Sequence, residues 1–215
     1  MGGRRKAITA LANRLTDDEG SAFPGSASPG TDATASYLVP AGVTQLRVEL
    51  WGGGGGGAGG DADSSAGGGG AQGDYAHAVV PVTPGTSCSV VVGGGGSGGA
   101  EYNGVMQRQG GTGNAGDASQ VTCGAVSVQA PGGGGGLGGN ENLGGQGGTN
   151  VATTQSAAVQ TYQGQPGSAG PLGGTATPGG AGGGVGFPGT GGMGGIALGN
   201  GSAGSPGLVL ITPVG

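Results

Sequence analysis

Apolar and polar residues alternate in several short segments of the chain. In residues 43–51, one face of an extended chain would carry Thr44, Leu46, Val48 and Leu50, and the other Val43, Gln45, Arg47, Glu49 and Trp51. This period of two predicts a half-buried β-strand. Similar patterns predict strands at 75–82, 87–92 and 120–128, and a short, fully apolar strand at 208–211 suits the middle of a sheet.

A turn signal separates two of these predicted strands. Thr83-Pro84-Gly85 lies between 75–82 and 87–92, and proline followed by glycine favours a tight reversal of the chain. We therefore expect the two strands to pair with each other as a hairpin.

A helical pattern occurs near the N-terminus. Residues 4–15, RRKAITALANRL, place Ile8, Leu11, Ala12 and Leu15 on one stripe. A helix this short is marginal in water, so we expect the stripe to dock onto another copy or a partner. Residues 20–36 are rich in Gly, Ser, Ala and Pro and predict a linker. The expected division is a docking segment with linker at 1–36 and a β-domain at 37–215.

Glycine-rich segments separate the predicted strands. They lie at 52–60, 67–70, 93–99, 132–148 and 164–207, and between Gly180 and Gly207 every third residue is glycine except Leu198. A period of three fits the extended polyproline II helix, and a glycine edge lets two such helices approach until their backbones touch. We predict an all-β, sandwich-like domain with packed polyglycine II helices, plus a short N-terminal helix or extended anchor.

The same period assigns faces to the last glycine segment. Gly189 and Gly192 are expected to face a neighbouring helix. Phe187, Met193 and Ile196 share another edge, which is expected to cover the β-region or an adjacent helix.

Composition narrows the classes of function. The chain has 64 glycines, 8% charged residues and a formal net charge of −5. Because no basic stripe is present to neutralise phosphates, nucleic acid is not expected as a partner. No apolar run is long enough for membrane insertion, and the N-terminus lacks the apolar segment of a secretory signal.

Catalytic chemistry has weak support in the sequence. His77 lies alone in a predicted strand, which favours a filler role over that of a base, and Asp61 and Asp63 favour a solvated loop over a Ca²⁺ site. Trp51 favours anchoring of the β-core over stacking on a sugar. We expect no enzyme, no catalytic residues, no metal site and no cofactor.

Two cysteines, Cys88 and Cys123, lie in separate predicted strands. Their spacing matches no zinc motif. Two buried free thiols are favoured, and a disulfide between them remains open.

Three segments occur in a particular order: SYLVPAGVTQLRVELWGGGGGGAGG, then AHAVVPVTPGTSCSVVVGGGGSGG, then GSPGLVLITP. This order resembles the glycine-rich domain of bacteriophage tail-fibre and virion proteins, over about residues 36–215. The resemblance implies a virion structural protein on the surface of the phage particle. The N-terminal segment has no counterpart in that domain and looks like a virion anchor, with Arg4, Arg5, Ile8, Leu11 and Leu15 as its contact residues.

Some phage adhesins of this kind carry layers of polyglycine II helices whose loops bind the host surface. Loops that interrupt the glycine segments here are therefore candidates for binding a host glycan or protein, and the alternative is that they are only turns. The candidate residues are Tyr102, Asn103, Arg108, Asn142, Tyr162 and Gln163.

The resemblance leaves the place of the protein open. The favoured interpretation is a tail-fibre, spike or adhesin component. It is expected to bind other virion proteins through residues 1–36 and to form a homo-oligomer, such as a trimer. A capsid decoration or head-fibre protein is the first alternative. An ice-binding polyglycine II protein is the second, although Thr190, Ala197 and Ala203 do not form the flat face it would need.

Overall fold

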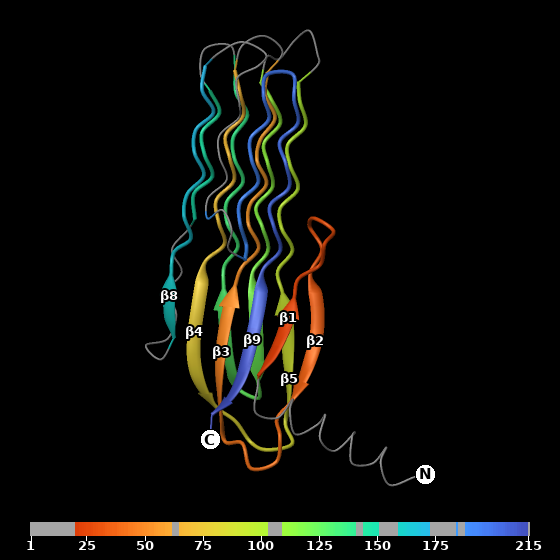
Figure 1. Cartoon of the computed structure of the whole chain (residues 1–215), viewed down its shortest axis with the longest axis vertical. Helices are drawn as coiled ribbons and strands as arrows, with labels where there is room; N and C mark the ends of the chain where they lie inside the picture. Colours follow the sequence, from red (N-terminus) through yellow and green to blue (C-terminus); the bar gives the residue numbers. More distant parts are fainter. Residues whose placement is uncertain are drawn as a thin grey trace, which may run out of the picture.

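The structure is a computed structural model that describes residues 20–61, 65–102, 109–140, 144–150, 159–172, 184 and 188–214. In these residues the chain forms two antiparallel β-sheets that continue at one end into a bundle of extended glycine-rich segments (Figure 1). The strands are β1 (Ser21–Pro24), β2 (Ala33–Leu38), β3 (Gln45–Trp51), β4 (Tyr75–Pro81), β5 (Ser87–Val92), β6 (Ser119–Cys123), β7 (Val126–Ala130), β8 (Gln160–Tyr162) and β9 (Leu208–Val214). The predicted all-β class is confirmed, and the predicted N-terminal helix lies outside the described residues.

The two sheets pack face to face over one hydrophobic core. One sheet has the order β1-β9-β3-β4-β8 and the other β2-β5-β6-β7. Alternate residues of β3, from Leu46 to Leu50, are fully buried, and they share one core with inward residues of both sheets such as Val90 and Ile211. The predicted faces of β3 are therefore confirmed. So is the interior place of the last strand, since β9 lies between β1 and β3.

The hairpin prediction for 75–82 and 87–92 was wrong. β4 pairs with β3 and β8, whereas β5 pairs with β2 and β6 in the other sheet. The turn at Thr83-Pro84-Gly85 does reverse the chain, but it carries the chain from one sheet to the other. A turn signal specifies the reversal and not the partner, and both strands bury one apolar face in the shared core.

The segment 120–128 is two strands and not one. β6 and β7 form a hairpin whose turn contains Gly124 at φ 59°, a left-handed conformation that glycine adopts without strain. The apolar alternation runs through both strands and conceals the break.

The linker prediction for residues 20–36 was also wrong. β1 pairs with β9 and β2 pairs with β5, so these residues extend one edge of each sheet. Phe23 packs edge-on against Tyr37, with ring centroids 6.5 Å apart. A strand at the edge of a sheet buries little side-chain surface. Small polar residues can therefore form such a strand once its backbone is paired with the neighbouring strand.

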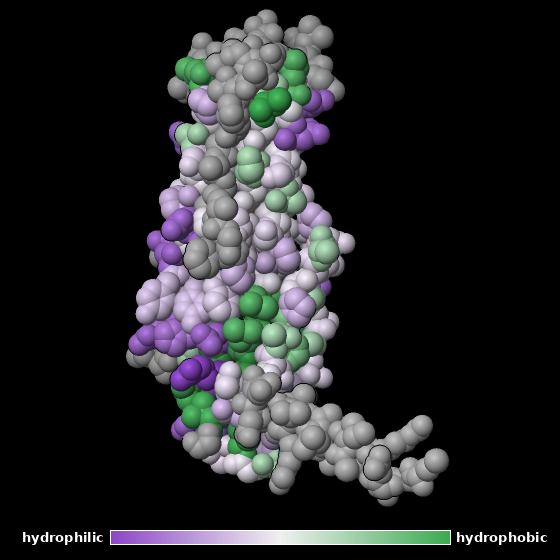
Figure 2. Space-filling view, viewed as in Figure 1, coloured by the Kyte–Doolittle hydropathy of each residue, from purple (hydrophilic) through white to green (hydrophobic). Residues whose placement is uncertain are grey.

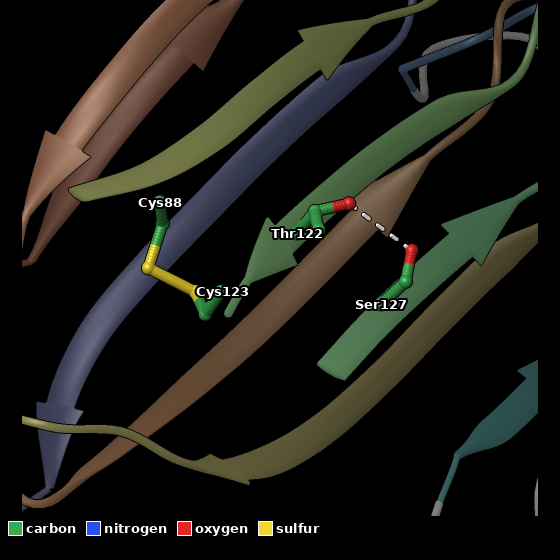
Figure 3. Close-up of a disulfide and its surroundings, with 4 residues drawn as sticks. All are labelled: Cys88, Thr122, Cys123 and Ser127. Carbon is green, nitrogen blue, oxygen red and sulfur yellow. Dashed lines mark hydrogen bonds between the residues drawn. A yellow bond between two sulfur atoms is a disulfide. The ribbon is translucent and has the colours of Figure 1, made fainter. Parts of the chain in front are cut away.

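Cys88 and Cys123 form a disulfide between β5 and β6 (Figure 3), so the favoured prediction of two free thiols was wrong. Their Cα atoms are 4.4 Å apart. β5 and β6 are antiparallel and Ser89 lies opposite Thr122, so the positions next to this pair, Cys88 and Cys123, also face each other. Both cysteines are buried. Thr122 lies beside Ser127 of β7, with their hydroxyl oxygens 3.2 Å apart.

The glycine segments form extended rods that run side by side from one end of the two sheets (Figure 1). Rod 52–60 is at the centre of the bundle, and its consecutive N–H groups donate to three different neighbours. The pairs are Gly55 to Ala71 (2.9 Å), Gly56 to Asn114 (2.8 Å) and Gly57 to Ser202 (2.9 Å). The carbonyls of the same glycines accept from three further rods, through the N–H groups of Gly192, Gly136 and Gly99. Rod 52–60, which we call the central rod, therefore has six hydrogen-bonded neighbours.

The six neighbours also bond to one another and close a ring around the central rod. The connecting donor and acceptor pairs include Gly70 to Gly192, Ala71 to Gly134, Gly113 to Gly136, Asn114 to Ser97, Gly201 to Gly99 and Ser202 to Met193. Two more rods, 144–150 and 164–171, pack outside this ring against rod 65–74. With three residues per turn, each rod offers N–H and C=O groups in repeating directions, and the predicted polyglycine II packing is confirmed.

Most contacts between rods leave no room for a side chain, and the buried exceptions are small alanines such as Ala58 and Ala71. A Cβ atom built on Gly57 would lie 2.0 Å from the Met193 carbonyl oxygen, and one on Gly192 would lie 2.1 Å from that of Ser202. In rod 188–197 the Met193 and Ile196 side chains instead face outwards, 58% and 45% exposed. The expectation that this edge covers the β-region or another rod was therefore wrong for these two residues, and Phe187 lies outside the described residues.

We predict that Gly192→Val destabilises the protein by about 3 kcal/mol or more, because the new side chain forces two backbones apart. The matched control is Met193→Val, the next position on the same rod, whose exposed side chain should change stability by no more than about 0.5 kcal/mol. Urea unfolding of both variants measures the difference. Equal unfolding midpoints would show that the rods are not close-packed.

We predict that replacing both cysteines, Cys88→Ala with Cys123→Ala, lowers stability by about 2–4 kcal/mol, since the bond closes a loop with a sequence separation of 35. A reducing agent should lower the thermal midpoint of the original chain towards that of the double variant. The double variant itself should not respond to the reductant. If the original chain is equally insensitive, the bond does not contribute to stability.

Candidate functional site

The first candidate surface is the tip of the rod bundle, at the end far from the sheets. Hydrogen bonds tie the rod ends together there. Ser65 N–H donates to Asp61 Oδ1 at 2.7 Å, and the Ser65 hydroxyl donates to the carbonyl oxygen of Asn140. Glu101 N–H donates to Asn200 Oδ1 at 2.6 Å, and Tyr102 N–H donates to the carbonyl oxygen of Gly60 at 3.2 Å. These bonds join rod ends that are far apart in the sequence.

The tip also exposes apolar side chains. Leu172, Ile196 and Leu198 are 58%, 45% and 48% exposed, and Figure 2 shows hydrophobic residues at this end of the molecule. Leu198 has a φ of 58°, which non-glycine residues rarely adopt. It occupies the turn between rods 188–197 and 199–207, where its N–H donates to the Asp61 carbonyl oxygen.

The predicted recognition residues do not form one site. Tyr102 lies at the tip, whereas Tyr162 ends β8 and Gln163 follows it, at the other end of the rods. Asn103, Arg108 and Asn142 lie outside the described residues. The predicted anchor residues also lie outside them: Arg4, Arg5, Ile8, Leu11 and Leu15.

The second candidate surface surrounds Tyr162, on the outer face of the five-stranded sheet. The sheet register places Trp51 opposite Tyr75 and Tyr75 opposite Tyr162, so three aromatic residues form one row across β3, β4 and β8. The ring centroids are 4.7 Å apart for Trp51 and Tyr75, and 5.9 Å for Tyr75 and Tyr162. Trp51 points away from the core, so the prediction that it anchors the core was wrong.

The next row along the sheet is polar. It contains Glu49, His77 and Gln160 at directly opposed positions. The His77 ring stacks on Tyr162, with an angle of 12° between the ring planes and 6.1 Å between centroids. Its Nδ1 atom is buried and has no hydrogen-bond partner within the described part of the chain.

Tyr75 joins the aromatic and polar rows. Its hydroxyl donates a hydrogen bond to Glu49 Oε1 at 2.8 Å. Burial, which disfavours the charged phenolate, raises the pKa of Tyr75 from 10.0 to about 12, and the hydrogen bond and negative charge of Glu49 add to this rise. The hydroxyl therefore remains protonated at neutral pH and holds Glu49 in place.

A cleft of about 260 Å³ opens beside the aromatic row, where β4 and β8 meet the rods. Its lining residues are Gln72, Gly73, Tyr75, Tyr162, Gln163, Gly164 and Gln165. Asp74, which is 1% exposed, supports the cleft from within. Its Oδ1 accepts hydrogen bonds from Gly164 N–H at 2.9 Å and from Asn150 Nδ2 at 2.6 Å. The Gln163 side chain donates to the Asn150 carbonyl oxygen at 3.1 Å.

Sequence reasoning found only part of this surface. Tyr162 and Gln163 stood out because they interrupt the glycine segments. The outward residues of 43–51 were also assigned to one face, including Glu49 and Trp51. Nothing in the sequence showed that β4 and β8 would place Tyr75 and Tyr162 beside them.

The chain belongs to the glycine-rich domain family, whose family model matches residues 29–210. No curated protein sequence matches the chain significantly. Among the described residues there is no cluster of three or more His, Cys, Asp or Glu side chains that suits a metal ion. Within the same residues, no helical segment has the length and hydropathy that crossing a membrane requires.

We predict that one of the four tyrosines, Tyr75, ionises at a pH near 12, and that Glu49→Gln moves its pKa back towards 10.0. Alkaline absorbance titration measures this, and Tyr75→Phe assigns the late step. The pKa of Tyr75 is higher in the folded protein than in the unfolded chain, so unfolding releases the phenol proton between about pH 10 and 12. The free energy of unfolding that Tyr75 contributes therefore falls as the pH rises through this window. The control Glu101→Gln, at the exposed tip, should leave the late step unchanged.

Proposed function

We propose that this protein is a bacteriophage virion structural protein, of the tail-fibre, spike or adhesin kind, which presents a rigid domain for attachment to the host surface. The observation that carries the proposal is that the domain has two different ends. The rod ends at Asp61, Tyr102 and Leu198 lie at the tip, whereas β1 begins and β9 ends at the opposite, β-sandwich end (Figure 1). Such a domain holds the rod ends at the tip away from the start of β1 and the end of β9.

The rod lattice supports a display role. Rod 52–60 spans about 28 Å at about 3.1 Å per residue, and its backbone groups bond to neighbours on six sides. Rod ends held on a rigid support lose little conformational entropy on binding, which favours recognition of another surface. The exposed Leu172, Ile196 and Leu198 supply apolar contact area at this end.

Several features fit a role outside the cell and without catalysis. The Cys88–Cys123 disulfide is of the kind that persists in oxidising surroundings. The candidate surfaces contain mainly aromatic, amide and aliphatic groups, which suit binding, and the Glu49 carboxylate among them is held by the Tyr75 hydroxyl. The partners in this proposal are other virion proteins, reached through the N-terminal segment, further copies of the chain such as those of a trimer, and a glycan or protein of the host surface.

We predict that removing residues 1–19 abolishes association with virions and leaves the domain folded, because both sheets begin after this segment. Purified particles carrying the full or shortened chain are fractionated, and the chain is detected by immunoblot. Circular dichroism of the shortened protein checks the fold.

A pair of substitutions refines the test. Leu11→Asp with Leu15→Asp places charges on the apolar stripe of 4–15 and should release the protein, whereas Asn13→Asp, off the stripe, should not. If the original chain, the Leu11→Asp with Leu15→Asp variant and the Asn13→Asp variant all co-purify with particles, the apolar stripe is not the anchor. If the full chain never co-purifies with particles, the virion proposal fails and a free binding protein replaces it.

A further inference from the structure

We propose that the cleft beside Tyr75 and Tyr162 binds a single uncharged pyranose ring of a glycan. The proposal concerns the side of the domain and not the tip, and it does not depend on attachment to a virion. Figure 2 shows this face of the five-stranded sheet, with hydrophilic residues gathered over β4 and β8 and hydrophobic ones over β9.

The aromatic row supplies an apolar platform for the sugar. One face of a pyranose ring presents C–H groups, which carry partial positive charge and are attracted to the electron-rich faces of aromatic rings. Tyr162 is 56% exposed, and its ring is stacked on His77 from the neighbouring strand. Tyr75 is fixed by Trp51 on one side and by its hydrogen bond to Glu49. The platform therefore exists before a ligand binds.

The glutamines supply polar partners for the hydroxyl groups. Gln72, Gln163 and Gln165 line the same cleft. Each amide has two N–H donors and one acceptor oxygen, and Gln163 donates one of its N–H groups to Asn150. The remaining amide groups suit sugar hydroxyls because these also donate and accept. The backbone under them is held by Asp74 and Asn150. An arrangement of aromatic faces with a few positioned polar groups is typical of small-molecule sites.

The size and charge of the cleft limit the class of ligand that it can bind. Its volume of about 260 Å³ lies just below the range of about 300–1,000 Å³ that is usual for drug-sized ligands, which suits one ring with the rest of the glycan outside. None of its lining side chains is charged. At the edge of the cleft, the Glu49 carboxylate accepts a hydrogen bond from the Tyr75 hydroxyl. The whole chain carries a net charge of −5. An anionic sugar would find no cation in the described lining, so a neutral hexose or N-acetylhexosamine is the ligand class.

The test uses the full chain and its own fluorescence. Trp51 is the only tryptophan of the sequence and packs against Tyr75, so its emission reports on the cleft. The probes are the methyl glycosides of glucose, galactose, mannose and N-acetylglucosamine, with N-acetylneuraminic acid as the anionic probe. Saturation-transfer NMR on the same samples measures contact with the ligand directly.

At least one neutral glycoside should give a saturable change in emission and a saturation-transfer signal, and N-acetylneuraminic acid should give neither. Tyr162→Ala should weaken binding by about tenfold, the value of one aromatic stacking contact. Gln163→Ala should weaken it to a smaller degree. The control Val79→Ala is exposed on the same face of β4 but outside the cleft, and it should bind as the original chain does.

Three results would overturn the inference. The first is no saturable response to any neutral glycoside by either method. The second is unchanged affinity in both Tyr162→Ala and Gln163→Ala. The third is preferred binding of the anionic probe. Circular dichroism of each variant separates loss of binding from loss of fold, and Gln163→Ala, whose side chain is exposed beyond the strand, keeps the test valid if Tyr162→Ala unfolds.

Discussion

The whole structure depends on hydrogen bonds between the backbones of polyglycine II rods. An extended glycine chain has no internal hydrogen bonds, so every N–H and C=O group needs a partner elsewhere or water. Around the central rod these partners come from six neighbours, and a Cβ atom at any of its glycine positions would collide with a neighbouring backbone. This requirement explains why glycine is so frequent, and it explains how a chain with few aromatic and aliphatic residues folds at all.

A lattice of this kind must begin and end somewhere, and polar side chains occupy those places. Where the rods meet the sheets, Ser119 Oγ accepts from Gly93 N–H at 2.9 Å and donates to the Trp51 carbonyl oxygen at 2.6 Å. Asp32 Oδ1 accepts from Gly94 N–H at 3.0 Å. At the tip, Asp61 does the same for Ser65. The sheets have a matching role, because their register fixes where each rod starts along the bundle axis.

The sequence predicts the parts of this protein more readily than their arrangement. The period of three in the glycines and the period of two in residues 43–51 each follow from local geometry, and both predictions are confirmed. The partner of each strand is a non-local choice: the turn at Thr83-Pro84-Gly85 gave the wrong pair for β4, and the polar composition of 20–36 concealed two edge strands. The aromatic row of Trp51, Tyr75 and Tyr162 was not predictable for the same reason, since it exists only through that pairing.

The lattice also determines where recognition can take place. The buried rod positions hold glycine or, as at Ala58 and Ala71, alanine, so they offer no side chain that could encode a binding specificity. The outer faces of the rods are open to substitution, but in the described rods they present scattered side chains such as Met193 on a convex surface. Along the described rods, a cluster of exposed apolar side chains and a cleft occur where the regular repeat is interrupted, at the tip and at the junction with β4 and β8. The Tyr75 and Tyr162 cleft lies at that junction, where glutamines of two rods meet the aromatic row of the sheet.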